Sequence, residues 1–194
     1  MRNIETEAQV KKKQRRNQWI IGIVLIVVML GSSFAIVVDS FGKQKSQKIV
    51  FNGVEFQQSN GLWFSQSGGF NLVSFYNPLQ TENTSAEVKD ITNYQNKPLY
   101  LYSESREAEV EIYRNLDPQS NNIVERIQQA CPKDENCSSE IPVKDCSNNF
   151  IIIRYSSTSQ STLTQNQSCV LINSTPEKIL EITDEYLFKL FGIK

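Results

Sequence analysis

An uncharged run of twenty residues, from Trp19 to Val38, constrains this chain more strongly than any other feature. At ~1.5 Å per residue, a helix of this length covers ~30 Å, which is the hydrocarbon thickness of a bilayer. Thirteen of the twenty residues are Ile, Leu, Val or Phe, which favour insertion at the membrane centre. We therefore predict a transmembrane helix over residues 18–38, which makes the membrane lipid bilayer one partner of the chain.

Basic residues are distributed unevenly around this run. Residues 1–17 contain six Lys or Arg residues, whereas the stretch after the run contains Lys43, Lys45 and Lys48. Because Lys and Arg are retained in the cytoplasm, this bias predicts that the N-terminus lies inside and the rest lies outside. The expected organisation is a single-pass protein of the cell membrane with a cytoplasmic basic tail (1–17), a signal anchor (18–38), a linker (39–48) and an extracytoplasmic domain (49–194).

A cleaved signal peptide is the alternative interpretation of the N-terminal segment. Ser33-Phe34-Ala35 carries the small residues of an A-x-A cleavage site. The apolar run continues beyond that site through Val38 and is longer than the apolar region of a signal peptide, which favours retention. Both alternatives place the following domain outside the cytoplasm.

The charge of the external part argues against nucleic acid as a partner. Residues 42–194 contain 14 Lys plus Arg and 18 Asp plus Glu, which gives a net charge of −4. Without a basic field, the domain has little to neutralise phosphates. Envelope proteins or a membrane complex are the expected partners.

The chain contains no histidine. This absence removes Ser-His-Asp and Cys-His nucleophile activation, and it removes His-ligated zinc and haem. We predict no catalytic, cofactor-binding or metal-binding residue. Three alternating glutamates, Glu107, Glu109 and Glu111, have no neighbouring base or ligand pattern, and we interpret them as a solvated face.

All four cysteines lie in the part of the chain that the charge bias places outside: Cys131, Cys137, Cys146 and Cys169. An even number in an oxidising compartment predicts two disulfides, and four cysteines allow three pairings. We favour Cys131 with Cys137 and Cys146 with Cys169. No CxxC pair occurs, so structural disulfides are a better interpretation than a redox or metal site.

The expected fold class is α+β, with β-hairpins and a mixed sheet packed by two or three helices and stapled by disulfides. The strongest turn signal is Asn52-Gly53 between alternating apolar residues, which predicts a hairpin over residues 49–56. The other expected elements are a hairpin of 62–64 and 70–76, a loop at 77–96, a strand at 99–102, helices at 105–116 and 118–131, paired strands at 150–153 and 170–172, a loop at 156–168 and a helix that starts at Thr175-Pro176 and stops at Gly192.

Four N-x-S/T triplets offer sites for glycosylation in such a domain. Asn83 and Asn166 are the candidates. Asn173 is weakened by the nearby Pro176, and Asn136 is weakened by the cysteine inside its own triplet.

Several short segments carry a resemblance to other proteins. They are the basic tail and single span, the Asn-Gly hairpin, Ile141-Pro142-Val143-Lys144-Asp145-Cys146, Cys169-Val170-Leu171-Ile172 and Leu187-Phe188-Lys189-Leu190-Phe191-Gly192-Ile193. In this layout the chain resembles a loose group of uncharacterised, single-span, membrane-anchored archaeal proteins. The resemblance implies an archaeal envelope setting and brings no activity, cofactor or catalytic residue.

The sequence therefore predicts a non-enzymatic binding or assembly module of the cell envelope. The alternative is an anchored extracytoplasmic enzyme, either a thiol-disulfide oxidoreductase that uses Cys131 or Cys137 or a histidine-free hydrolase that uses carboxylates. A free, low-pKa thiol or a deep cleft with paired carboxylates would favour the enzyme.

Overall fold

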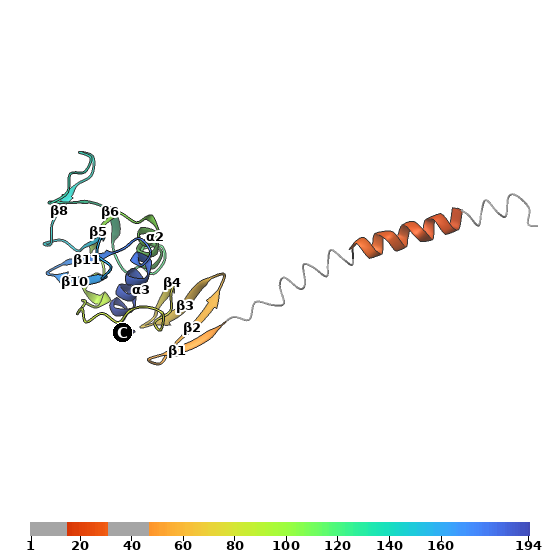
Figure 1. Ribbon diagram of the computed structural model, residues 1–194, viewed down its shortest axis with the longest axis horizontal. Coiled ribbons are helices and arrows are strands. Elements are labelled where there is room, and N and C mark those ends of the chain that lie inside the picture. The colour runs from red at the N-terminus through yellow and green to blue at the C-terminus, as the bar shows by residue number, and fades with distance from the viewer. Residues whose placement is uncertain (1–14, 31–46) are drawn as a thin grey trace, which may run out of the picture. The chain divides into compact units, whose positions relative to one another are not determined.

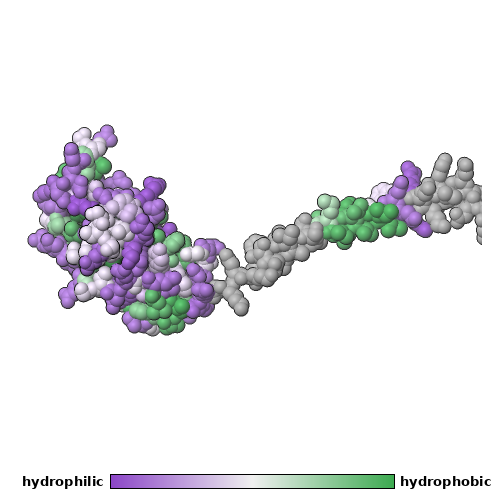
Figure 2. All heavy atoms as spheres, viewed as in Figure 1, coloured by the Kyte–Doolittle hydropathy of each residue, from purple (hydrophilic) through white to green (hydrophobic). Residues whose placement is uncertain are grey.

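The computed structural model describes residues 15–30 and 47–194 of the chain. The chain divides into two compact units, residues 1–45 and 46–194, which are described separately. In the first unit, residues 15–30 form a helix that is hydrophilic at its start and hydrophobic further along (Figure 2). Among the described residues, no helix has both the length and the apolar character needed to cross a membrane. Residues 31–38 of the predicted span, and residues 39–46 of the predicted linker, lie outside the described residues.

The second unit begins with a four-stranded antiparallel meander (Figure 1). Tight two-residue turns connect its strands, and the predicted hairpin at Asn52-Gly53 is confirmed, because both residues have positive φ (46° and 82°). Asn60-Gly61 forms a second turn of the same kind. The strands are β1 (Lys48–Phe51), β2 (Val54–Ser59), β3 (Leu62–Ser67) and β4 (Phe70–Ser74).

A mixed five-stranded sheet forms the centre of this unit, with the order β10-β11-β9-β5-β6. Four of its strands run parallel, and β10 at one edge runs antiparallel to β11. The strands predicted at 99–102, 150–153 and 170–172 are all present, and the last two pair as expected. The strands are β5 (Pro98–Ser103), β6 (Arg126–Gln129), β9 (Phe150–Tyr155), β10 (Thr162–Asn166) and β11 (Cys169–Ser174).

Two α-helices pack between the meander and this sheet (Figure 1). α2 (Arg106–Leu116) matches the predicted helix and is capped by Ser105, whose hydroxyl accepts the Ala108 N–H. α3 (Ile179–Leu190) is the central element, because nine of its twelve residues are buried. Phe188 of α3 meets Phe56 of the meander edge to face, with ring centroids 5.8 Å apart. A short 3-10 helix, η1 (Ile91–Asn93), interrupts the loop that precedes β5.

A cysteine-bearing segment covers part of the opposite face of the mixed sheet. It contains a short parallel pair of strands, β7 (Cys131–Pro132) and β8 (Val143–Lys144). Both favoured disulfides are present, Cys131 with Cys137 and Cys146 with Cys169. The second disulfide lies in a small apolar cluster with Tyr100, Phe150 and Ile152. The predicted disulfide-stapled α+β fold is thus confirmed for the described domain.

Side chains complete the hydrogen bonding of the outer edge of β4. The Asn115 side-chain amide donates to Val73 O and accepts from Val73 N, both at 2.8 Å. Asn121 does the same for Asn71, at 2.7 Å to O and 3.0 Å from N. Asp184 Oδ2 then accepts the Phe75 N–H at 3.0 Å. Three side chains thus occupy the positions that a fifth strand would take, and they join the meander to the helices.

The predicted helix over 118–131 is wrong. Asp117 ends α2 as its C-cap, and its carboxylate accepts the Gln119 N–H in a turn. Asn122 then takes a left-handed conformation with φ of 53°, and the chain enters β6 beside β5. The Asp-Pro pair that suggests a helix start therefore ends the preceding helix, since proline restricts the residue before it.

Two other expectations need correction at their boundaries. The polar segment 156–168 is not all loop, because residues 162–166 form β10 and pair with β11. The last helix begins at Ile179 and not at Thr175-Pro176, which form a separate turn closed by the Lys178 N–H to Thr175 O bond. Its predicted stop at Gly192 is confirmed by a φ of 67°.

Candidate functional site

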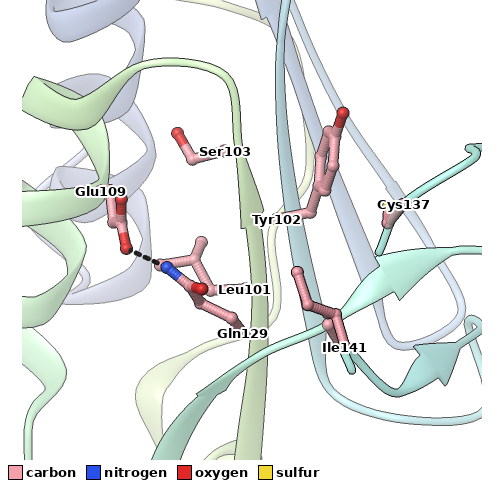
Figure 3. A pocket seen from close by; sticks show the side chains of 8 residues that line it. Leu101, Tyr102, Ser103, Glu109, Gln129, Cys137 and Ile141 are labelled. Atoms are coloured by element: carbon pink, nitrogen blue, oxygen red, sulfur yellow. Dashed lines mark hydrogen bonds between the residues drawn. The ribbon is translucent and has the colours of Figure 1, made fainter. Parts of the chain in front are cut away.

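A small pocket lies beside β5 at the point where its neighbour β6 ends (Figure 3). Its volume is about 140 Å³. Glu109 and Gln129 meet on one side of the strand, and Tyr102, Cys137 and Ile141 lie on the other (Figure 3). Leu101, Ser103 and Ala130 complete the lining. This is the carboxyl end of parallel strands, where ligands of open α/β sheets bind.

Local structure fixes the polar groups of the pocket. Glu109 lies in the first turn of α2, and its Oε1 accepts a hydrogen bond from Gln129 Nε2 at 2.9 Å. The Ser103 hydroxyl donates to Ser105 O at 2.6 Å, which holds it at the junction of β5 and α2. The pocket therefore combines an aliphatic lining with a carboxylate, an amide and a hydroxyl.

The electrostatic field beside the pocket is mainly negative. Burial raises the pKa of Tyr102, and the nearby charges of Glu135, Glu104 and Asp134 raise it further, against the opposing effect of Arg154. No Lys or Arg lines the pocket. A cationic group would thus be favoured over an anionic one in this position.

A disulfide-closed loop borders the pocket. Cys131 and Cys137 close the loop, and Arg154 at the end of β9 binds Asp134 through both carboxylate oxygens at 2.9 Å. Arg154 also binds Glu135 at 3.2 Å. The disulfide closes the loop, and the ion pairs of Arg154 link it to the carboxyl end of β9.

A second unusual feature is a buried carboxyl pair formed by Glu111 of α2 and Asp184 of α3. Asp184 is fully buried and Glu111 is 2% exposed. Burial raises the pKa of Asp184 well above its usual value, and the charge of Glu111 raises it further. Burial also raises the pKa of Glu111, although the Arg114 guanidinium opposes this effect. Two adjacent carboxylates cannot both ionise at low cost, so the pair retains a shared proton.

Each carboxyl of the pair uses one oxygen for outside partners. Asp184 Oδ2 accepts the N–H groups of Phe75 and Tyr76 at 3.0 and 2.7 Å, and Glu111 Oε2 binds Arg114 at 2.6 Å. The other oxygens, Asp184 Oδ1 and Glu111 Oε1, are buried with no further partner, and the two side chains hydrogen-bond to each other. A proton retained on one carboxyl lets that group donate to the other.

The interpretation of Glu107, Glu109 and Glu111 as a solvated face is wrong for Glu111. Glu107 is exposed and Glu109 is half-buried, whereas Glu111 points into the domain beside Ile112. Paired carboxyls can serve acid–base chemistry. The pockets beside α2, however, are lined by other residues, and Asp184 has no exposed surface.

Another buried charge links α3 to the polar loop after β4. Glu185 is fully buried, and its Oε2 accepts from Lys194 Nζ at 2.6 Å and from the Thr81 hydroxyl at 2.9 Å. Lys194 Nζ also donates to Thr81 O at 3.2 Å. This charge is paired and hydrogen-bonded, as a buried carboxylate requires.

The cysteines and the two candidate glycosylation sites all lie in the described part of the chain. All four cysteines are in disulfides, so the structure offers no free thiol for an oxidoreductase. Asn83 and Asn166 are both exposed, one in a loop and one at the end of β10. Their glycosylation stays a prediction.

In the described segments, 15–30 and 47–194, no cluster of three or more Cys, Asp or Glu residues could hold a metal ion.

Comparisons with known proteins do not identify a relative. No protein-family model matches the chain, and neither curated proteins nor solved structures gave a match. The resemblance to membrane-anchored archaeal proteins therefore stays a prediction, and the functional argument depends on the geometry.

Sequence reasoning did not find the pocket or the carboxyl pair. The pocket joins residues from β5, α2, β6 and the disulfide loop, which lie far apart in the sequence. Asp184 sits within the apolar stripe of the last helix, and a charged residue inside such a stripe is the one signal that pointed to it.

The carboxyl pair predicts that the domain loses stability as pH rises. Because the folded state binds the proton more tightly than the unfolded state, this contribution is complete below about pH 4 and declines as pH rises through the raised pKa of the pair. We expect a slope of up to about 1.4 kcal/mol per pH unit in that window. Asp184→Asn, whose amide can donate to Glu111, should flatten the slope, which urea unfolding at pH 4.5–8.5 would measure.

Glu107→Gln, at an exposed position of the same helix, is the matched control and should keep the wild-type slope. An unchanged slope in Asp184→Asn would contradict the shared proton.

Proposed function

We propose that this chain is a single-pass membrane protein whose disulfide-bonded domain lies outside the cytoplasm and serves as a binding or assembly module of the cell envelope. The anchor is supported by the uncharged run from Trp19 to Val38 and by the exposure of its apolar side chains, since Ile20 to Leu30 include none of the buried core residues. The excess of basic residues before the run supports the orientation. The two disulfides support an oxidising compartment.

The observation that carries the binding role is the pocket beside β5. Its volume of about 140 Å³ is small beside the ~300–1,000 Å³ typical of sites for drug-sized ligands. A single side chain of a partner protein fits this size, and buried anchor side chains dominate protein interfaces. The aliphatic lining of Leu101, Ala130 and Ile141 suits a long side chain, and Glu109 suits a cationic end. The proposed partner thus inserts a Lys or Arg side chain.

The topology is tested by adding a protease to intact cells that carry the full chain with an epitope tag at each end. We expect the C-terminal tag to be removed from outside and the N-terminal tag to stay protected and membrane-bound, because the basic residues hold the N-terminus in the cytoplasm. Permeabilised cells, in which both tags become accessible, are the control. Protection of the C-terminal tag in intact cells would contradict the topology.

The pocket is tested by binding of short fluorescent peptides with a central Arg to the full chain in nanodiscs. Ile141→Trp should weaken binding at least tenfold by filling the pocket, and Glu109→Gln should remove the preference for Arg over norleucine. Val143→Trp, at an exposed position of β8 two residues further along the chain and outside the pocket lining, is the matched control and should bind as the wild type does. Equal affinity of Ile141→Trp and Val143→Trp would contradict the proposed site.

A further inference from the structure

The two edge strands of the meander, β1 and β4, differ in the hydrogen bonds of their outward-facing backbone groups. At β4, the outward-facing backbone groups of Asn71 and Val73 are bonded by the side chains of Asn121 and Asn115. At the other edge, β1 has no neighbouring strand in the described part of the chain. An uncovered strand edge is a template for pairing with another chain.

The register of the first hairpin shows which groups of β1 are open. The Gln58 N–H donates to Gln47 O, so residues 47, 49 and 51 direct their backbone groups toward β2. Lys48 and Val50 alternate with them and direct their N–H and C=O groups away from β2. The open edge therefore offers two donors and two acceptors in a regular row.

We propose that the β1 edges of two copies of this chain pair antiparallel about a twofold axis at Ile49. In this register Lys48 of one copy lies opposite Val50 of the other on both sides of the axis. All four outward groups of each β1 strand are then bonded, and the two Lys48 side chains do not face each other. The result is a continuous eight-stranded sheet with a closed, isologous interface.

The chemistry of β1 favours a second copy as the occupant. Its apolar residues Ile49, Val50 and Phe51 are uncharged, and Val50 is 68% exposed, so a strand of the same composition is complementary. α2 packs beside β4, at the other edge of the meander from β1.

The length of the preceding segment agrees with this arrangement. About Ile49, the two β1 strands would begin within about 15 Å of each other, from the strand rise and strand spacing. The eight residues at 39–46 reach at most about 29 Å, so both chains can enter one membrane. This step depends on the proposed membrane anchor, which would also concentrate copies in one plane.

Disulfide cross-linking of the full chain in liposomes tests the pairing. The native cysteines are all bonded, so an introduced cysteine is the one free thiol. At the axis, the two Ile49→Cys residues would form a non-hydrogen-bonded pair with Cα atoms about 4.5 Å apart, which suits a disulfide. We expect Ile49→Cys to give at least ten times more cross-linked dimer under mild oxidation than Val50→Cys, which lies off the axis on the opposite face.

The variant Val50→Pro provides a second test of the pairing. Val50→Pro removes an outward N–H that the β1–β2 hairpin does not use, so it should reduce the Ile49→Cys cross-link to the level of Val50→Cys. Equal cross-linking of the two cysteine variants would overturn the pairing, as would an Ile49→Cys cross-link that persists with proline at position 50. If the proline variant fails to fold, the comparison of the two cysteine variants decides alone. A failed cross-link would not change the result of the protease experiment, so the β1 pairing and the membrane topology are tested independently.

Discussion

The hydrogen bonds along the edge of β4 hold the two halves of the domain together. The meander packs on the rest of the domain through the buried side chains of Phe56, Trp63 and Leu72, and further apolar side chains of the meander are partly buried against the same core. Apolar packing is not directional, whereas the side chains of Asn115, Asn121 and Asp184 bind alternate backbone positions and so fix one register. Loss of Asn115 would leave the half-buried N–H and C=O of Val73 without these partners, at a cost of at most about 1–3 kcal/mol each.

The same edge explains why α3 carries buried charges. Asp184 must reach the Phe75 and Tyr76 amides from a helix that lies between two sheets, so it is removed from water and retains a proton with Glu111. Glu185, the next residue, faces Lys194 and Thr81 instead. Both carboxyls therefore connect α3 to the segment that follows β4: Asp184 accepts the Phe75 and Tyr76 N–H groups, and Glu185 accepts the Thr81 hydroxyl.

Local signals in the sequence predicted most of the fold. The Asn-Gly turn, the helix over 105–116, the apolar strands 150–153 and 170–172, and the disulfide pairs all depend on nearby residues or on compartment, and the structure confirms them. β6 lies where the sequence predicts a helix, because its pairing with β5 joins segments about 28 positions apart and local periodicity does not report such pairing. The pocket and the carboxyl pair depend on tertiary contacts of this kind, which is why sequence patterns did not reveal them.

Amide hydrogen exchange at Val73 and Phe75 tests the role of this edge most directly. Their N–H groups bind side chains and not another strand, so an ordinary edge strand would leave them unprotected. We predict that both amides exchange as slowly as Ile151 in the central strand β9, and that Asn115→Ala accelerates exchange at Val73 while Ile151 stays protected. Rapid exchange at Val73 in the wild-type chain, or equal exchange in Asn115→Ala, would contradict it.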